Sequence, residues 1–403
     1  MSDHLVNKRL GYALVLGSLA ALGPLCTDLY LPALPTLAHE LDTTTATSQL
    51  SLTTGLLGLG AGQLIFGPLS DRFGRIRPLL FSLFLLLAAS LWCALAPNID
   101  QLIIARLLQG IAGAGGAVLS RAVARDLYSG HELTKFFGLL MLVNGLAPII
   151  APVLGGGLLT FLSWRGIFGA LAVISVMLFI ASYAKLHETL PVERRSSGGA
   201  GAMLKSLMML LSERQFMGLC LTQGFVMAGM FSYIGASPFV LQQIYSLSPI
   251  AFSLCFAING MGLVIAAQIS TRLAAVWGEL MMVKIGLCIA AVASVALVIA
   301  GMVHAPLVAL LVPLFFSIMN IGIIGPNAGS LAMQSQGRNA GSASALLGVC
   351  MFALGAIAVP FTGIGGTSAL SMGLTICGCF FIAILMFVFL ARPTFRKSLI
   401  PQT

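Results

Sequence analysis

The sequence predicts an all-α polytopic membrane protein, with twelve transmembrane helices in two pseudo-symmetric six-helix bundles. Three observations predict this class: 58% of the 403 residues are hydrophobic, only 8% are charged, and the mean hydropathy is +1.02. A chain of this composition has lipid as its main solvent. Turn residues and charges divide it into twelve apolar segments, each near the ~20 residues that a helix needs to cross the hydrocarbon.

The twelve segments alternate with loops whose charge sets the expected orientation. With the amino terminus inside, nineteen of the twenty-one Lys and Arg residues lie on the cytoplasmic side, the usual bias of membrane proteins. Both termini are therefore expected in the cytoplasm, and the net charge of +9 needs no nucleic-acid partner. The expected spans are 10–33, 48–68, 78–96, 101–124, 136–160, 165–186, 214–242, 250–275, 281–303, 306–333, 340–362 and 367–391.

The longest polar interruption begins at His187 and separates six spans from six. It contains Arg194 and Arg195, followed by a flexible run of serine and glycine. We expect a first bundle over 1–186, a cytoplasmic linker over 187–213 and a second bundle over 214–403. Two bundles joined in this way are typical of transporters that rock their halves about a site at the membrane midplane.

One acid lies at membrane depth within apolar sequence. Asp28 falls in the first expected span, where an ionised carboxylate is costly, so a functional role is the default interpretation. Its one evident partner of opposite charge is Arg106 in the fourth span, although Arg106 could instead snorkel from a helix end. The second half has no charge at this depth. We therefore expect Asp28 and Arg106 to carry proton coupling.

Polar and soft side chains at helical spacing predict a cavity lining. Arg106, Gln109, Gly110 and Gly113 share one helical face, which favours a polar stripe. Methionine and aromatic residues suit a polyspecific pocket, because Met is flexible and polarizable, although core packing is the alternative for each residue. The expected substrate contacts are Asp28, Tyr30, Arg106, Gln109, Asn144, Gln223, Met227, Phe231, Tyr233 and Asn259.

The loop after the second span sets one acid among three arginines. It reads Gly67-Pro68-Leu69-Ser70-Asp71-Arg72-Phe73-Gly74-Arg75-Ile76-Arg77. Its two glycines, Gly67 and Gly74, are expected to turn the backbone sharply. The pattern predicts a latch in which Asp71 meets an arginine or the positive end of a helix. A loop that only fixes topology is the alternative. The expected cytoplasmic gate comprises Gly67, Asp71, Arg72, Gly74 and Arg75.

This loop resembles the signature between helices two and three of the major facilitator superfamily, and 102–114 resembles that superfamily's second signature, whose arginine is implicated in proton transfer. Segment 145–156 resembles the antiporter signature of its drug-efflux members. There two prolines bend the helix and two glycines allow close helix approach, with a packing kink as the alternative. These antiporter-motif residues are Gly145, Pro148, Pro152, Gly155 and Gly156. Segment 27–35 is similar to the bicyclomycin-resistance (Bcr/CflA) subgroup of drug:proton antiporters.

The resemblance implies a major facilitator fold and a proton-coupled multidrug exporter that works by alternating access. It implies small-molecule drugs, protons and membrane lipid as partners, no cofactor, and a monomer in the bacterial cytoplasmic (inner) membrane. Ala20 and Ala21 stand where some drug:proton antiporters carry a second acid, which favours neutral or singly charged substrates. A metabolite exporter or uptake symporter of the same fold is the alternative, and a membrane enzyme is a distant third.

Other classes lack their sequence signals. The chain has no Gly-x-x-x-x-Gly-Lys-Ser/Thr loop for ATP, and the glycines of 58–62 are better explained by helix packing than by a dinucleotide site. The eight cysteines lie in apolar runs without the paired spacing of a metal site, so they are expected to be core residues. We therefore expect neither a metal site nor an enzyme.

Overall fold

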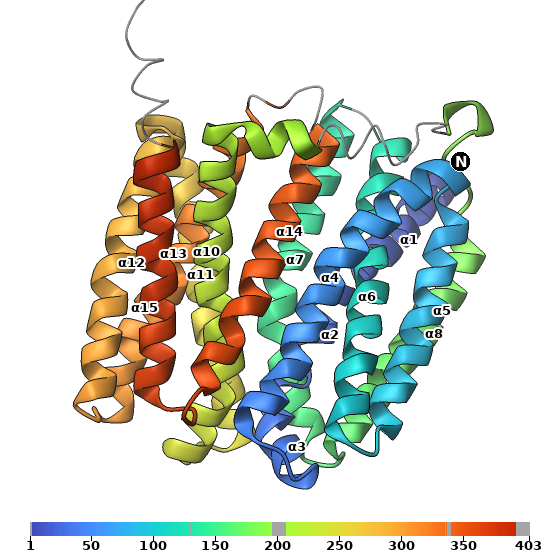
Figure 1. Ribbon diagram of the computed structural model, residues 1–403. Helices are drawn as coiled ribbons and strands as arrows, with labels where there is room; N and C mark the ends of the chain where they lie inside the picture. The colour runs from blue at the N-terminus through green and yellow to red at the C-terminus, as the bar shows by residue number, and fades with distance from the viewer. Residues whose placement is uncertain (1, 129, 196–206, 335, 337–339, 392–403) are drawn as a thin grey trace, which may run out of the picture. The chain divides into compact units, whose positions relative to one another are not determined.

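The computed structural model describes residues 2–128, 130–195, 207–334, 336 and 340–391 (Figure 1). Every regular element in these ranges is helical. The chain divides into two compact units, Met1–Thr43 with Thr54–Gly199, and Thr44–Thr53 with Ala200–Thr403. Helix α4 (Thr45–Phe73) therefore contributes residues to both units.

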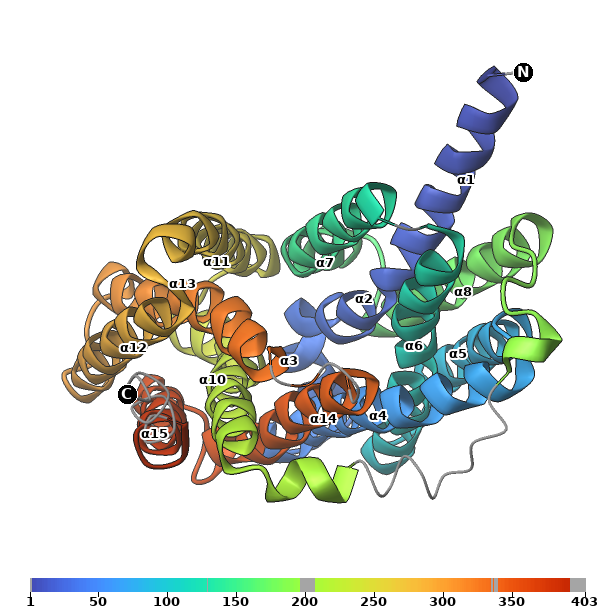
Figure 2. The same ribbon diagram turned by 90° about the horizontal axis from the view of Figure 1, so that it is seen from above.

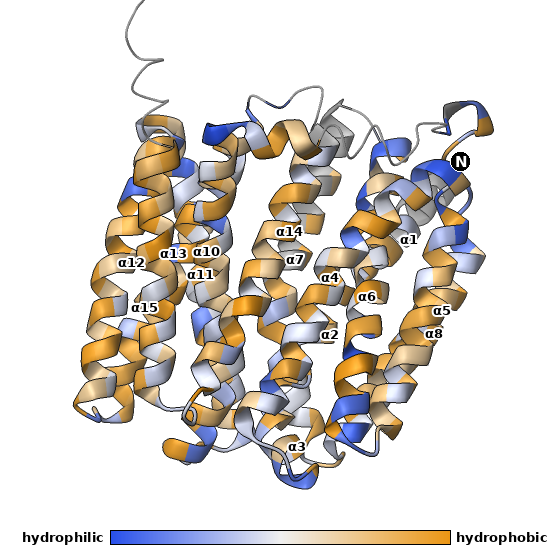
Figure 3. Cartoon of the chain, viewed as in Figure 1, coloured by the Kyte–Doolittle hydropathy of each residue, from blue (hydrophilic) through white to orange (hydrophobic). Residues whose placement is uncertain are grey.

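Eleven helical spans within the described ranges are long and apolar enough to cross a membrane. A twelfth apolar stretch, Gly145–Leu158, lies in α7 (Gly130–Leu158). Hydrophobic residues dominate along the helices and hydrophilic ones gather near their ends (Figure 3). The all-α polytopic prediction is confirmed. The spans are Gly11–Glu40, Thr45–Phe73, Ile76–Leu95, Ile99–Leu127, Trp164–Lys185, Arg214–Ile244, Pro249–Trp277, Glu279–Met302, Leu307–Met333, Ser342–Gly363 and Ala369–Ala391.

In the first unit, α5 packs along both α6 and α8 (Figure 2). In the second unit, α10 packs against α13, α14 and α15, and α12 against α13 and α15. The first unit contains α1 (Ser2–Ala20), α2 (Leu22–Asp28), η1 (Leu31–Ala33), α3 (Leu34–Glu40), α5 (Ile76–Leu95), α6 (Ile99–Leu127), α7, α8 (Trp164–Lys185) and η2 (Val192–Arg194). The second contains α10 (Arg214–Phe239), η3 (Val240–Ile244), α11 (Pro249–Trp277), α12 (Glu279–Met302), α13 (Leu307–Met333), α14 (Ala340–Ala358), η5 (Val359–Gly363), α15 (Ala369–Met386) and η6 (Phe387–Ala391).

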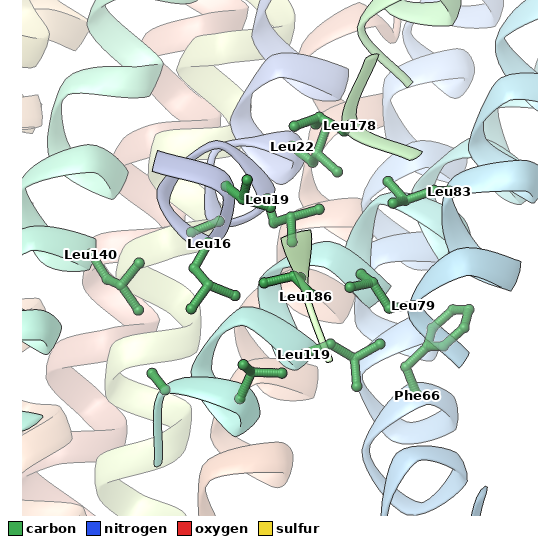
Figure 4. Close-up of a cluster of buried hydrophobic side chains, with 14 of the residues drawn as sticks. Leu16, Leu19, Leu22, Phe66, Leu79, Leu83, Leu119, Leu140, Leu178 and Leu186 are labelled. Atoms are coloured by element: carbon green, nitrogen blue, oxygen red, sulfur yellow. The ribbon is translucent and has the colours of Figure 1, made fainter. Parts of the chain in front are cut away.

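A cluster of buried leucines fills the first unit between α1, α5, α6 and α8. Leu16 and Leu19 of α1 meet Leu83 of α5 and Leu119 of α6 there, all at most 1% exposed (Figure 4). Lipid tails are as apolar as these side chains, so the cluster gains little from leaving lipid and depends on close van der Waals packing.

Glycines bring the backbones of α4 and α6 into direct contact. An alanine Cβ at Gly58, Gly62 or Gly110 would lie within 3.0 Å of a backbone oxygen of the facing helix, closer than real Cβ atoms approach. We call this contact the α4–α6 seam. It confirms that Gly58 and Gly62 serve helix packing, as expected from their small size.

The first span differs from its expected form. A single helix over 10–33 was expected, but the chain forms α1, α2, η1 and α3 in succession and continues to Glu40. Pro32 and Pro35 stand in the first turns of η1 and α3, where a missing N–H is tolerated, and this explains the new starts. As a result, α2 ends at Asp28.

Candidate functional site

Asp28 lies at the break in the first span and is 4% exposed. The residue before it, Thr27, donates its hydroxyl to the carbonyl oxygens of Gly23 and Pro24, both at 3.2 Å. The Thr27 hydroxyl thus bonds back to carbonyls one turn earlier in α2, a pattern that often bends a helix. Non-helical backbone at membrane depth is tolerated where it is buried in protein, and the residues of this break are buried. A carboxylate buried at such a break is a candidate functional group.

Arg106 of α6 is 1% exposed and is held from several sides. Its Nη1 donates to the carbonyl oxygen of Cys26 at 2.8 Å and to Oε1 of Gln109. Its guanidinium carbon lies 4.4 Å from the ring centroid of Tyr30 and 5.8 Å from that of Phe168. Stacked aromatic faces stabilise a desolvated guanidinium. This burial excludes the snorkelling interpretation of Arg106.

Gln109 orients Arg106 through a chain of hydrogen bonds. Its Nε2 donates to the hydroxyl of Ser90 on α5 at 2.9 Å, which fixes the amide so that its oxygen faces the guanidinium. The expected cavity stripe is wrong for its glycines: Gly110 belongs to the α4–α6 seam, and Gly113 faces the sulfur of Cys26. Both glycines are buried between helices because their lack of a side chain allows that approach.

The structure thus gathers four of the expected residues around one helix break: Asp28, Tyr30, Arg106 and Gln109. Sequence reasoning missed Phe168 and Ser90, each 0% exposed, and the carbonyl of Cys26. A polar serine inside the third apolar span was a usable signal for Ser90. Phe168 is one of 24 phenylalanines, and nothing local marks it.

Helix α7 brings the antiporter-like segment to the same break. Pro148 and Pro152 lie inside α7, and an alanine Cβ at Gly155 would overlap the carbonyl oxygen of Leu29, the residue after Asp28. Gly156 is buried beside Gly155, and Gly145 lies more than two helical turns earlier in α7. A close approach at Gly155 is therefore present, to the turn that follows α2 rather than to another helix, and the antiporter role of the segment stays a prediction. The side chain of Asn144 lies outside the described residues.

The second unit holds the other expected substrate contacts. The amide of Asn259 on α11 donates to the hydroxyl of Tyr233 at 2.9 Å, and the Tyr233 ring stacks on Phe256 at 5.3 Å. Gln223 is 7% exposed and its Nε2 lies 3.6 Å from the sulfur of Met351 on α14. Two further residues of α10 belong to this group, the half-buried Met227 and the buried Phe231. Their role in substrate binding stays a prediction.

The arginine-rich loop is shorter than expected. Helix α4 continues through Pro68 to Phe73, so Gly67 is helical and does not turn the backbone, contrary to our expectation. Gly74 alone makes the turn, with φ of +89°. Membrane helices tolerate internal proline because neighbouring groups re-satisfy the freed carbonyls, which explains why the helix did not end at Pro68.

Arg75 is the centre of this loop and is 7% exposed. Its Nη1 donates to Asp71 at 2.6 Å and to the hydroxyl of Ser70 at 2.9 Å, and its Nε donates to Asp126 of α6 at 2.8 Å. Burial alone would lower the pKa of Arg75, but the bonds to Asp126 and Asp71 outweigh it and raise the pKa. Asp71 thus meets an arginine, as the latch requires.

The remaining gate residue, Arg72, is exposed, with its guanidinium carbon 5.2 Å from the ring centroid of Phe73. Asp126 was not among the expected gate residues, although an acid two residues beyond an expected apolar span is a recognisable signal. The gating role of the loop stays a prediction.

Comparisons with known proteins agree with this architecture. Residues 16–360 match the profile of the Major Facilitator Superfamily. The uncharacterized MFS-type transporter YdgK of Bacillus subtilis is 44% identical over 369 residues, which cover 91% of this chain and 92% of YdgK. The bicyclomycin resistance protein homolog of Haemophilus influenzae is 27% identical over 387 residues, or 96% and 97% of the two chains.

Solved structures show the same fold at lower identity. The D-xylose-proton symporter superposes with a TM-score of 0.72 at 16% identity, over 94% of this chain and 98% of the symporter. At that identity the similarity concerns the fold alone. Because the profile match spans most of the chain and YdgK is similar over nearly its whole length, this integral membrane protein belongs to the major facilitator superfamily, as a transporter that needs no cofactor rather than an enzyme.

Proposed function

We propose that this chain is a proton-coupled multidrug antiporter that exports amphiphilic drugs by alternating access of two bundles, 1–186 and 214–403, about a linker over 187–213. The observation that carries the proposal is a buried carboxylate, Asp28, at a helix break whose backbone binds the equally buried Arg106. The name of the Haemophilus influenzae relative supports a drug as cargo. We place the protein in the bacterial inner membrane with both termini in the cytoplasm.

In this mechanism Asp28 alternates between its protonated and ionised forms. An ionised carboxylate at 4% exposure is costly in the membrane unless a proton, a cationic drug or Arg106 compensates its charge. Tyr30, Phe168 and Gln109 hold Arg106 in place, so its positive charge is a fixed element of the site. Proton and drug then compete for Asp28, and competition for one site is sufficient to couple their opposite movements.

The missing second acid narrows the substrate class. Ala20 is 2% exposed at the end of α1, about two turns before Asp28, where a second carboxylate would sit. With a single titrating group, the site is suited to neutral or singly charged amphiphiles rather than dications. The Tyr30 and Phe168 rings beside the site supply apolar contact that demands little directional fit.

Proteoliposomes with a buffered pH difference test both the coupling and its direction. Inside-acid liposomes containing the wild type should accumulate radiolabelled chloramphenicol, because protons leaving drive an antiported drug inward. A symporter would instead accumulate the drug in outside-acid liposomes. Asp28→Asn should lose the gradient-driven uptake while retaining drug binding. Asp42→Asn is the matched control, since Asp42 is exposed two residues after α3 and its φ of +46° suits asparagine equally.

Gradient-driven uptake by Asp28→Asn at the wild-type rate would remove Asp28 from the coupling mechanism. Drug accumulation by the wild type only in outside-acid liposomes would replace the antiporter with a symporter.

A further inference from the structure

The segment that follows α8 packs against the first unit and forms hydrogen bonds with it. Leu186 is 3% exposed and belongs to the buried leucine cluster, and Leu190 is 8% exposed. Between them, the hydroxyl of Thr189 donates to Oδ2 of Asp126 at 2.9 Å. Asp126 is the same carboxylate that binds Arg75. The start of the expected linker therefore contacts the arginine-rich loop.

Glu188 makes the central contact of this segment. Its Oε1 accepts the backbone N–H of Arg75 at 2.8 Å and that of Leu190 at 3.0 Å, and its Oε2 accepts the N–H of Ile76 at 3.3 Å. Helix α5 begins at Ile76, and its own N-cap residue, Arg75, supplies no side-chain cap. The first N–H groups of a helix need outside acceptors and favour negative charge. Glu188 supplies both from 112 residues away.

The turn at Gly74 leaves room for this carboxylate. Gly74 has φ of +89°, which disfavours any side chain, and an alanine Cβ there would overlap Oε2 of Glu188. It would also lie 3.0 Å from Nη2 of Arg195, a residue whose charge faces the same carboxylate. Burial would raise the pKa of Glu188, but three backbone N–H groups and Arg195 outweigh it and lower the pKa, so the cap is ionised at neutral pH.

We propose that Glu188 is a positioning residue of the cytoplasmic loop: by capping α5 from outside, it fixes the backbone of Arg75 so that one side chain reaches Asp71 and Asp126 together. The geometry requires such fixing, because Nη1 of Arg75 reaches back one turn to Asp71 while its Nε reaches across to α6. The same carboxylate joins the segment after α8 to the start of α5.

Backbone amide exchange tests the cap directly in the full-length protein in lipid nanodiscs. In Glu188→Ala the amides at the start of α5 should exchange faster by about fivefold, the order expected when an N-cap acceptor is lost. Glu188→Gln keeps an acceptor of the same shape without the charge and should lie between. The matched control is Glu193→Ala, which removes an exposed acid of the same segment, on η2, and should leave these amides unchanged.

A double-mutant cycle with Gly74 separates the contact from general destabilisation. Gly74→Ala should destabilise the wild type strongly, since the new Cβ meets Oε2 of Glu188 and adopts an unfavourable φ. In a Glu188→Ala background the collision is gone, so the same substitution should lower the unfolding temperature less. Equal losses in both backgrounds, or unchanged amide exchange in Glu188→Ala, would overturn the cap.

The positioning role rests on the drug transport proposed above and needs its own readout. Per folded molecule, Glu188→Gln should transport chloramphenicol with a several-fold lower kcat at unchanged KM, because the loop and not the drug site is disturbed. Glu188→Asp should recover part of the loss. Wild-type kcat in Glu188→Gln and Glu188→Ala would overturn the positioning role. Amide exchange and the double-mutant cycle need no substrate. A wild type that fails to transport drug would therefore refute the proposed function but would leave the capping of α5 by Glu188 unaffected.

Discussion

One methyl group added at Gly155 tests how tightly α7 is packed against the break at Asp28. An alanine Cβ there would be about 1.5 Å closer to the carbonyl oxygen of Leu29 than the 3.4 Å at which ordinary contact begins. Both atoms are fixed to backbone, so no side chain can rotate away and one segment must shift. Overpacking of this kind costs about 1–3 kcal/mol of unfolding free energy.

The displacement also reaches the proposed coupling site. Leu29 directly follows Asp28, and in catalytic sites a displacement of a reacting group by ~1 Å lowers the rate by up to about a hundredfold. We therefore expect Gly155→Ala to lose most of its pH-driven chloramphenicol uptake in proteoliposomes and to unfold at a lower temperature in nanodiscs.

Gly157→Ala provides the matched control on the same helix. No heavy atom lies within 4 Å of its added Cβ, and alanine has a higher helix propensity than glycine. Gly157→Ala should therefore transport normally and be as stable as the wild type or slightly more so. If both variants behave alike in uptake and in unfolding, the contact between α7 and Leu29 does not constrain the site, and the reasoning is refuted.

Three further predictions concern charge. Arg106→Lys should retain only part of the uptake, because an ammonium cannot stack on Tyr30 and Phe168 as a guanidinium does; full activity would contradict the assignment. With one proton site, a valinomycin-set potential without a pH difference should drive neutral chloramphenicol, at about 2.3 kcal/mol per charge per 100 mV. It should not drive a monocationic substrate that protein-free liposomes exclude. The opposite pattern would reject a single proton. Because the folded-state pKa of Glu188 is lowered, its cap should persist above the ordinary glutamate pKa of about 4.3 and be lost only as pH falls through the lower folded value. The exchange rate of the first α5 amides, corrected for intrinsic rates, should therefore rise over that pH range in the wild type. Glu188→Gln should show no such rise.

The sequence predicted the features that follow from energetic cost in lipid. Charged residues are rare in this chain, so Asp28 and Arg106 stood out, and both are buried around one break. The helical type of the spans followed from length and hydropathy, and the described residues hold eleven full spans and one shorter apolar stretch where twelve spans were expected. The boundaries near proline were harder, because Pro32 restarts a helix whereas Pro68 is absorbed inside one. Local sequence does not distinguish the two, since the outcome depends on what neighbouring helices offer the freed carbonyls.

The partners of these charges depended on contacts between distant segments. Arg75 binds Asp126 and Glu188, 51 and 113 residues away, and no local pattern specifies such pairs. Phe168 is equally invisible among many similar aromatic residues. In the second unit the sequence places no charge at membrane depth, so no residue stood out from its apolar surroundings as Asp28 did. Gln223 and Asn259 were therefore chosen on polarity alone.

The α4–α6 seam also bears on how this transporter can evolve. At Gly58, Gly62 and Gly110 every substitution adds at least a methyl group within 3.0 Å of the opposite backbone, so selection removes such variants regardless of the substrate. New substrate specificities must then arise where side chains have room to change, as at the half-buried Met227. In a drug-selected library, the seam should stay glycine while adaptive substitutions accumulate elsewhere.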